Sequence, residues 1–330
     1  MNSEPITTRR RRSQWLNVVI SLAIFVWLLR QIPLEELQTG LRRADWQLLL
    51  LGVCFIGIGL VLRAWRWQLF VNKAQRVMTF GDAIVLTFIG CALNVLLPAS
   101  MGDVAKSYYA YRRIGNKEVM LSSSLMDKAM GMLAGFVAGF PLAGWLQLWP
   151  YFWLGLGLSM LLTIILFFPR VLPWRLLSWL AERVGKQFDH SQLVAAATLS
   201  PALWGASFVL SVLAWVCTYV QFWLAFLAFG GNLGLGHVFA LTPVVMLTKL
   251  IPFTLDGLGP QEAVSVSLFL HQAGVAKTVT LLATLATRAI TSWLPAIIGL
   301  LLMLQQNRYL RFSSSSPDLA GLPSTEPPAP

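Results

Sequence analysis

Long apolar runs separated by short polar connections dominate this chain, and they predict membrane-spanning helices. A helix needs about 20 mainly apolar residues to cross the hydrocarbon core of a bilayer. Six runs approach or exceed that length, so we expect an all-α polytopic membrane protein with six spanning helices. The runs are Trp15–Leu29, Trp46–Leu62, Val119–Leu146, Tyr151–Phe168, Pro201–Phe229 and Val279–Leu304.

Two further apolar regions, Phe80–Leu97 and His237–Gly274, end in or contain a break rich in proline and glycine. In lipid, irregular backbone survives only where protein buries it or where it lines a watery cavity. We therefore predict two re-entrant helical hairpins, which brings the total to eight membrane segments. An ordinary surface loop joining two spanning helices is the alternative interpretation of the second break. The expected bend residues are Pro98, Gly102, Pro252, Gly257, Gly259 and Pro260.

Composition supports a membrane protein. Of all residues, 56% are hydrophobic and only 12% are charged, whereas soluble domains carry about 25% charged residues. The net charge of +11 therefore does not indicate nucleic acid, which we do not expect as a partner. The three cysteines lie in apolar segments without metal-ligand spacing, so we expect neither a metal site nor a cofactor.

The distribution of basic residues predicts orientation, because cytoplasmic loops carry an excess of Lys and Arg. It places the basic N-terminus (1–14), a linker (170–200) and the Ser/Pro-rich disordered tail (313–330) in the cytoplasm, with both chain ends on that side of the inner membrane. By the same rule the two hairpins enter from opposite faces. Basic and tryptophan residues after the second run are expected to anchor it at the cytoplasmic interface: Arg63, Arg66 and Trp67.

The two parts of the chain, about 46–146 and 202–304, share an order of features. Each has a hairpin, a proline- and glycine-containing break, a helix-like stretch and a span that carries charge. Their opposite orientation predicts an inverted repeat, an architecture of membrane transporters in which broken helices meet near the midplane.

One predicted span also carries a stripe of small residues. Ser123, Asp127, Gly131, Gly135 and Gly139 recur every four residues. This spacing places them on one face of a helix, where small side chains allow close helix packing.

Four groups of residues carry a family resemblance: Arg63, Arg66 and Trp67; Asn94, Pro98, Gly102 and Asp103; Pro252 to Glu262; and Arg288, Trp293, Leu294, Pro295 and Gly299. They resemble the lysylphosphatidylglycerol synthase transmembrane-region family, also called the flippase-like family. The resemblance covers about residues 15–312 and implies a domain that moves, or helps to move, a lipid between leaflets. In lysylphosphatidylglycerol enzymes a separate cytoplasmic domain transfers the amino acid, and the polar stretch 170–200 is too short to hold one.

Charged residues inside predicted membrane segments are the candidate substrate-binding and transport residues. Arg288 is the most informative, because an arginine deep in a span costs about 2.5–3.5 kcal/mol and needs a buried partner or a wet cavity. We expect Glu262 to be that partner, and both to face a cavity shared with Asp103 and Asp127, where a lipid phosphate would compete for Arg288. The other candidates are Lys249, Lys106, Lys128 and Asn94; structural ion pairs at an interface are the alternative for Asp103, Lys106, Asp127 and Lys128.

These residues and their spacing are compatible with three classes of function. The first is a flippase-like transporter of an anionic or modified glyco- or phospholipid. The second is a membrane transferase that uses a lipid-linked donor, for which only Glu35, Glu36 and Asp45 offer catalytic acids. The third is a non-catalytic membrane partner of a separately encoded lipid-modifying enzyme. We expect no catalytic residues, and a membrane lipid as the substrate.

Overall fold

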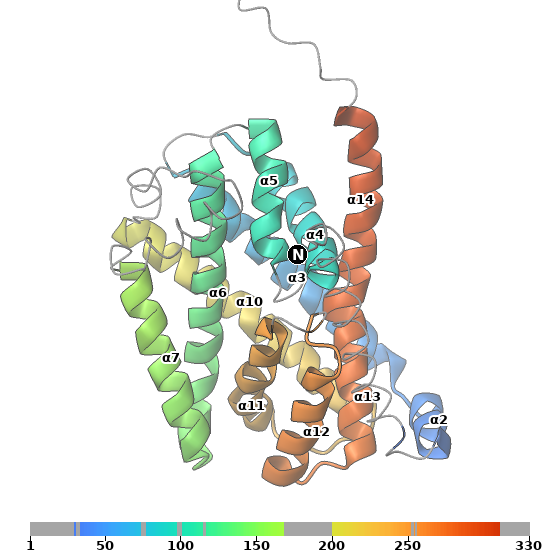
Figure 1. Cartoon of the computed structure of the whole chain (residues 1–330). Coiled ribbons are helices and arrows are strands. Elements are labelled where there is room, and N and C mark those ends of the chain that lie inside the picture. Colours follow the sequence, from blue (N-terminus) through green and yellow to red (C-terminus); the bar gives the residue numbers. More distant parts are fainter. Residues whose placement is uncertain are drawn as a thin grey trace, which may run out of the picture.

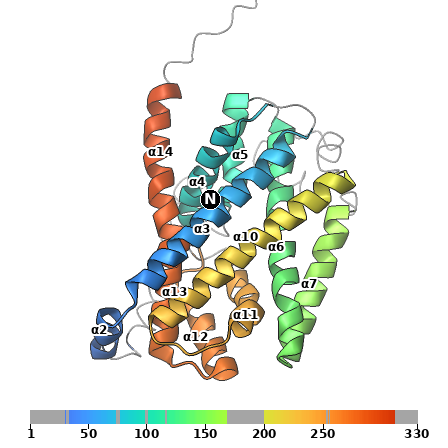
Figure 2. The ribbon, with the colours of Figure 1, turned by 180° about the vertical axis from the view of Figure 1, so that it is seen from behind.

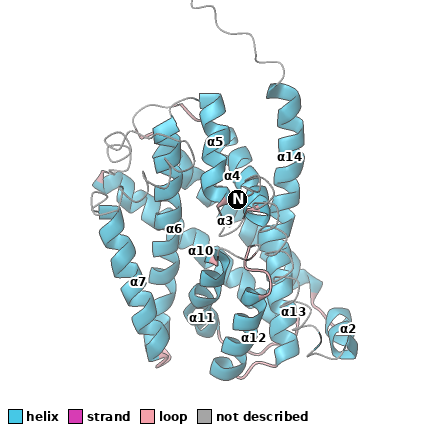
Figure 3. Ribbon diagram, in the orientation of Figure 1, coloured by secondary structure: helices cyan, strands magenta, loops and turns pink. Residues whose placement is uncertain are grey.

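The computed structural model describes residues 30, 34–73, 77–97, 101–114, 117–167, 200–251, 254 and 256–310. Helices and loops make up this part of the chain, without strands (Figure 3). The all-α fold predicted from sequence is therefore confirmed. The elements are α2 (Leu34–Arg42), α3 (Trp46–Val71), α4 (Phe80–Leu96), α5 (Gly102–Ile114), α6 (Lys117–Trp145), α7 (Trp149–Phe167), α10 (Pro201–Ala228), α11 (Leu235–Leu247), the 3₁₀ turn η2 (Thr248–Leu250), α12 (Pro260–Ala273), α13 (Lys277–Arg288), the π-helical turn η3 (Ala289–Trp293) and α14 (Leu294–Leu310).

Five of the six predicted spans lie in the described residues, and all five are helices long and apolar enough to cross a membrane. The sixth, Trp15–Leu29, lies outside the described residues, as do the segments 1–14 and 313–330 and nearly all of the linker 170–200. Helix α3 continues to Val71, so the predicted end of its span at Leu62 was wrong. The charged turn beyond Leu62 stays helical because its arginines find partners inside the protein.

The two interrupted regions fold as helical hairpins at opposite ends of the molecule. Figure 1 shows α4 and α5 towards the upper end and α11 and α12 towards the lower end. The break of each hairpin faces the middle of the bundle. Pro98 and Pro252, predicted at these bends, lie outside the described residues.

The second break owes its shape to backbone conformations that few residues adopt. Asp256, Gly257 and Gly259 all have positive φ, which glycine adopts without steric cost and aspartate tolerates better than most residues. The Gly259 N–H donates to the carboxylate of Glu262 (2.7 Å), and Pro260 begins α12. The Glu262 carboxylate thereby satisfies one otherwise unpaired N–H at the start of the helix, which begins directly after the break.

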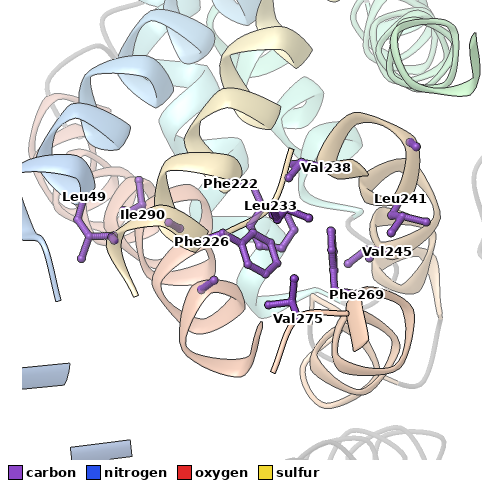
Figure 4. Packing of buried hydrophobic residues seen from close by; sticks show 14 of the residues in the cluster. Leu49, Phe222, Phe226, Leu233, Val238, Leu241, Val245, Phe269, Val275 and Ile290 are labelled. Carbon is purple, nitrogen blue, oxygen red and sulfur yellow. The ribbon is translucent and has the colours of Figure 1, made fainter. Parts of the chain in front are cut away.

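Long helices hold the hairpins in place. Helices α3 and α10 lie side by side across the back of the molecule (Figure 2), and α6 packs against α5, α10 and α11. A buried aromatic cluster of Phe222, Phe226 and Phe269 joins α10 to α12 (Figure 4). The second hairpin is thus fixed to a spanning helix by apolar packing.

Small residues on α6 and α14 permit these close contacts. A Cβ added to Gly135 would lie 2.7 Å from the indole of Trp215, and one added to Gly131 would lie 3.2 Å from the guanidinium of Arg66. The predicted small-residue face of α6 is therefore a packing face, as expected. Gly299 on α14 similarly lies against the backbone of Phe88 on α4, where any side chain would overlap.

Candidate functional site

A cavity of about 220 Å³, with charged side chains set among apolar ones in its wall, lies where the two breaks meet the middle of the bundle. The first hairpin contributes Asn94, Asp103 and Lys106, and the second break contributes Lys249 and Asp256. The spanning helices and the π-helical turn supply the rest of the wall, which includes Arg63, Arg66, Asp127, Lys128, Gly131, Trp215, Thr218, Tyr219, Thr291 and Ser292. Segments distant in sequence thus share one charged interior.

The first group of charges in the wall is the Asp127 triad, which consists of Arg66, Lys106 and Asp127. One Asp127 oxygen accepts from Arg66 Nε at 2.6 Å, and the other accepts from Lys106 Nζ at 3.3 Å. All three side chains are buried. A single carboxylate therefore pairs with two cations from two other helices and neutralises the charge of one, which leaves the triad with one positive charge.

Further contacts fix both cations of the Asp127 triad. Arg66 Nη1 donates to the hydroxyl of Ser211 on α10 at 2.8 Å. The Lys106 ammonium lies 4.3 Å from the ring centroid of Trp67, within the range of a cation–π interaction. These contacts correct the expectation that Arg66 and Trp67 anchor α3 at a membrane interface. Both are buried, and tertiary partners rather than lipid head groups surround them.

The second group of charges is the Arg288 cluster, in which Arg288 contacts Glu262, Gln261 and Asp256. Arg288 Nε donates to Glu262 at 2.6 Å, Nη2 donates to Gln261 Oε1 at 2.9 Å, and Nη1 donates to the Asp256 carbonyl at 3.0 Å. The predicted pairing of Arg288 with Glu262 is therefore present. Both side chains are almost completely buried, and charged residues in membrane segments generally pair with one another in this way.

The Arg288 guanidinium and the Glu262 carboxylate lie behind the cavity wall. Neither Arg288 nor Glu262 lines the cavity, whereas Asp256 and Lys249 do. This corrects the expectation that a phosphate competes directly with Glu262. The cluster instead holds the loop that carries Asp256, whose carboxylate accepts from Lys249 Nζ at 3.3 Å. Lys249 also donates to Ser292 in the π-helical turn at 3.0 Å.

In the first hairpin, close packing brings the break to the cavity. The side chain of Asn94, near the end of α4, accepts from the backbone N–H of Asp103 at 3.1 Å and so satisfies an otherwise unpaired donor at the start of α5. Gly102 lies directly against the backbone of α4 near Gly90 and Asn94, so any side chain there would overlap. Six of the eight predicted substrate-binding residues line the cavity: Asn94, Asp103, Lys106, Asp127, Lys128 and Lys249.

Arg63, predicted as an interface anchor, also belongs to the cavity wall. Its Nη2 donates to the hydroxyl of Thr218 at 3.0 Å, and its guanidinium carbon lies 5.7 Å from the ring centroid of Trp215. Sequence reasoning missed Thr218 and Trp215 altogether. Their spacing of three residues places them on one face of α10 and could have indicated that they lie together. Nothing in the sequence indicates that they contact Arg63.

Comparison with known proteins agrees with this architecture. The profile described as "Lysylphosphatidylglycerol synthase TM region" matches residues 14–299. The chain belongs to this family. A UPF0104 membrane protein of Pyrococcus horikoshii is 23% identical over 336 aligned positions, which cover 92% of this chain and 99% of that protein. The chain described here is accordingly a multi-pass membrane protein, and its cavity lies inside the matched region.

Proposed function

We propose that this protein moves a lipid with a phosphate-containing head group between the leaflets of the inner membrane. The observation that supports the proposal is the charged cavity between the breaks of the two hairpins. Charged side chains within a membrane protein's interior mark pathways for polar substrates. The cavity is smaller than typical pockets for whole ligands, which measure about 300–1,000 Å³. It suits a polar head group whose acyl chains remain in the bilayer.

The topology that goes with this proposal is an inverted repeat with both chain ends in the cytoplasm. The hairpins would then be re-entrant, α4–α5 from the cytoplasmic face and α11–α12 from the outer face. Their position at opposite ends of the molecule (Figure 1) supports this arrangement. Rocking of one half against the other would expose the same cavity to each leaflet in turn.

Helix orientation also favours an anionic group in this position. Helices α5 and α12 both begin at a break, so their N-terminal ends point towards the middle of the molecule. A helix N-terminus carries a partial positive charge that stabilises an anion by about 0.3–1 kcal/mol at exposed sites. Each break would therefore add to the attraction from the cationic side chains.

The proposal is tested by filling the cavity. Val95 lines it, whereas its neighbour Leu96 is 63% exposed. Val95→Trp should abolish lipid movement, and the matched control Leu96→Trp should leave it unchanged. The assay uses purified protein in liposomes with tail-labelled phosphatidic acid, phosphatidylglycerol or phosphatidylethanolamine, each tested separately. A membrane-impermeant reductant then reports how much label reaches the outer leaflet.

The outcomes separate the classes of function. Movement that persists in a folded Val95→Trp protein refutes transport through this cavity. No movement by the purified protein, with movement restored by a co-purifying enzyme, indicates a membrane partner instead. Formation of a new lipid product from a lipid-linked donor indicates a transferase.

A further inference from the structure

The cavity wall has an excess of positive charge. Five of its side chains are cationic, namely Arg63, Arg66, Lys106, Lys128 and Lys249. Three are carboxylates, namely Asp103, Asp127 and Asp256. The Arg288–Glu262 pair behind the wall is neutral as a pair and does not change this difference. This excess attracts anions, and an anion with two negative charges would neutralise it in full.

Arg63, which is partly buried, differs in its partners from the two buried arginines of this region, Arg66 and Arg288. Arg66 and Arg288 each donate to a carboxylate at 2.6 Å. Among the described residues, no carboxylate lies within ion-pair distance of Arg63, which contacts the Thr218 hydroxyl and the Trp215 ring. A guanidinium has five N–H donors, and the Thr218 contact uses one of them. The planar guanidinium is therefore positioned at the cavity with donors for an anion.

We propose that the cavity selects a phosphate monoester head group and that Arg63 is its specificity-determining ligand. A phosphate monoester carries about −1.5 to −2 charges at pH 7, which matches the excess of two. A phosphodiester carries one negative charge and leaves the excess half neutralised, and a zwitterionic head group leaves it unchanged. Arginine suits this role because its fork pairs with two phosphate oxygens at once.

The neighbours of Arg63 hold the guanidinium in place for this task. Thr218 both accepts from Arg63 and donates to the carbonyl of Ala214 at 3.0 Å, so its hydroxyl is fixed within α10. Trp215 covers the guanidinium on one side. Little side-chain freedom then remains to be lost when a phosphate binds, which is the condition for tight recognition.

This inference rests on the proposed function, and its test separates the two. Full-length protein is placed in phosphatidylcholine liposomes doped with phosphatidic acid (a monoester), phosphatidylglycerol (a diester) or phosphatidylethanolamine (a zwitterion). At pH 7.5 we expect phosphatidic acid to move at least tenfold faster than the other two. The preference should fall below about pH 6, where the monoester takes up its second proton. Binding, followed as a shift in thermal unfolding, should show the same order.

Variants of the wall identify the ligand. Arg63→Gln should lower the preference for phosphatidic acid tenfold or more, and Thr218→Val should lower it less, because the charge remains and only its position is lost. Arg42→Gln, an exposed arginine on α2, is the matched control and should change nothing. If Arg63→Gln fails to fold, Thr218→Val carries the test.

Equal rates for the three lipids overturn the monoester assignment while leaving lipid movement intact. A preference for phosphatidic acid that survives in Arg63→Gln overturns the role assigned to Arg63. Absence of movement for every lipid, with selective binding of phosphatidic acid, overturns the proposed function but supports the assignment. Absence of both refutes both. Inorganic phosphate is added in a parallel arm, and complete competition at equal concentration would identify free phosphate rather than a lipid as the ligand.

Discussion

Replacing Arg288 by methionine removes the centre of the Arg288 cluster. Glu262 then keeps a buried negative charge whose remaining hydrogen bond within the described residues comes from the Gly259 N–H, and the acceptors on Gln261 and Asp256 lose their donor. Breaking a buried ion pair from one side costs about 3–5 kcal/mol. At about 2–4 °C per kcal/mol, Arg288→Met should lower the unfolding temperature by about 6–20 °C.

The second substitution tests whether the charge pair causes that loss. In Arg288→Met/Glu262→Gln no unpaired charge remains, and the residual cost is that of unsatisfied hydrogen-bonding groups, about 1–3 kcal/mol each. The double variant should therefore be more stable than Arg288→Met alone. Arg288→Lys should lie between the starting protein and Arg288→Met, because one ammonium cannot reach three acceptors that lie in different directions.

Thermal unfolding in detergent, followed by tryptophan fluorescence and by the fraction of monodisperse protein, measures these differences. A double variant as unstable as Arg288→Met would refute the reasoning, since it would mean that the uncompensated Glu262 charge contributes nothing. Equal stability of all the variants would mean that the cluster is accessible to water.

Two further predictions concern packing and topology. Gly135→Leu should reduce the folded yield, because its Cβ would lie 2.7 Å from Trp215 and overpacking costs about 1–3 kcal/mol. Gly157→Leu on α7 should be tolerated, because nothing lies within 4 Å of the added Cβ. Size-exclusion chromatography measures the yield of folded protein for both variants. The topology is tested with single cysteines at two exposed positions in a chain without its native cysteines. A cysteine at Asn232 should react with an impermeant thiol reagent only from outside, and one at Val77 only from the cytoplasm. The reverse pattern would overturn the proposed orientation.

The sequence predicts most of the fold, because the length of apolar runs is a local property. The break at Gly257 and Gly259 could also be predicted, because irregular backbone within an apolar region must be buried in protein or line a watery cavity. The pairing of Arg288 with Glu262 could be predicted because a buried arginine needs an acid and few were near in the sequence.

Other parts of the site could not be predicted because they depend on tertiary contacts. Arg66 lies between two tryptophans, a pattern that indicates a membrane interface in an isolated sequence. Its partner Asp127 is 61 residues away, and only the packing of α6 against α3 brings them together. Packing of α3 against α10 places Arg63, an expected surface anchor, in the cavity wall beside Thr218 and Trp215.

The π-helical turn Ala289–Trp293 determines how α14 is rotated about the helix axis relative to α13. On its N-terminal side Arg288 faces α12, and on its C-terminal side Gly299 faces α4. A π turn holds one residue more than an α turn, and each residue rotates an α-helix by about 100°. Loss of one residue here would leave the span long enough to cross the membrane but would turn one contact away from its partner. The number of residues in this turn therefore fixes whether both ends of the last span can meet their partners at the same time.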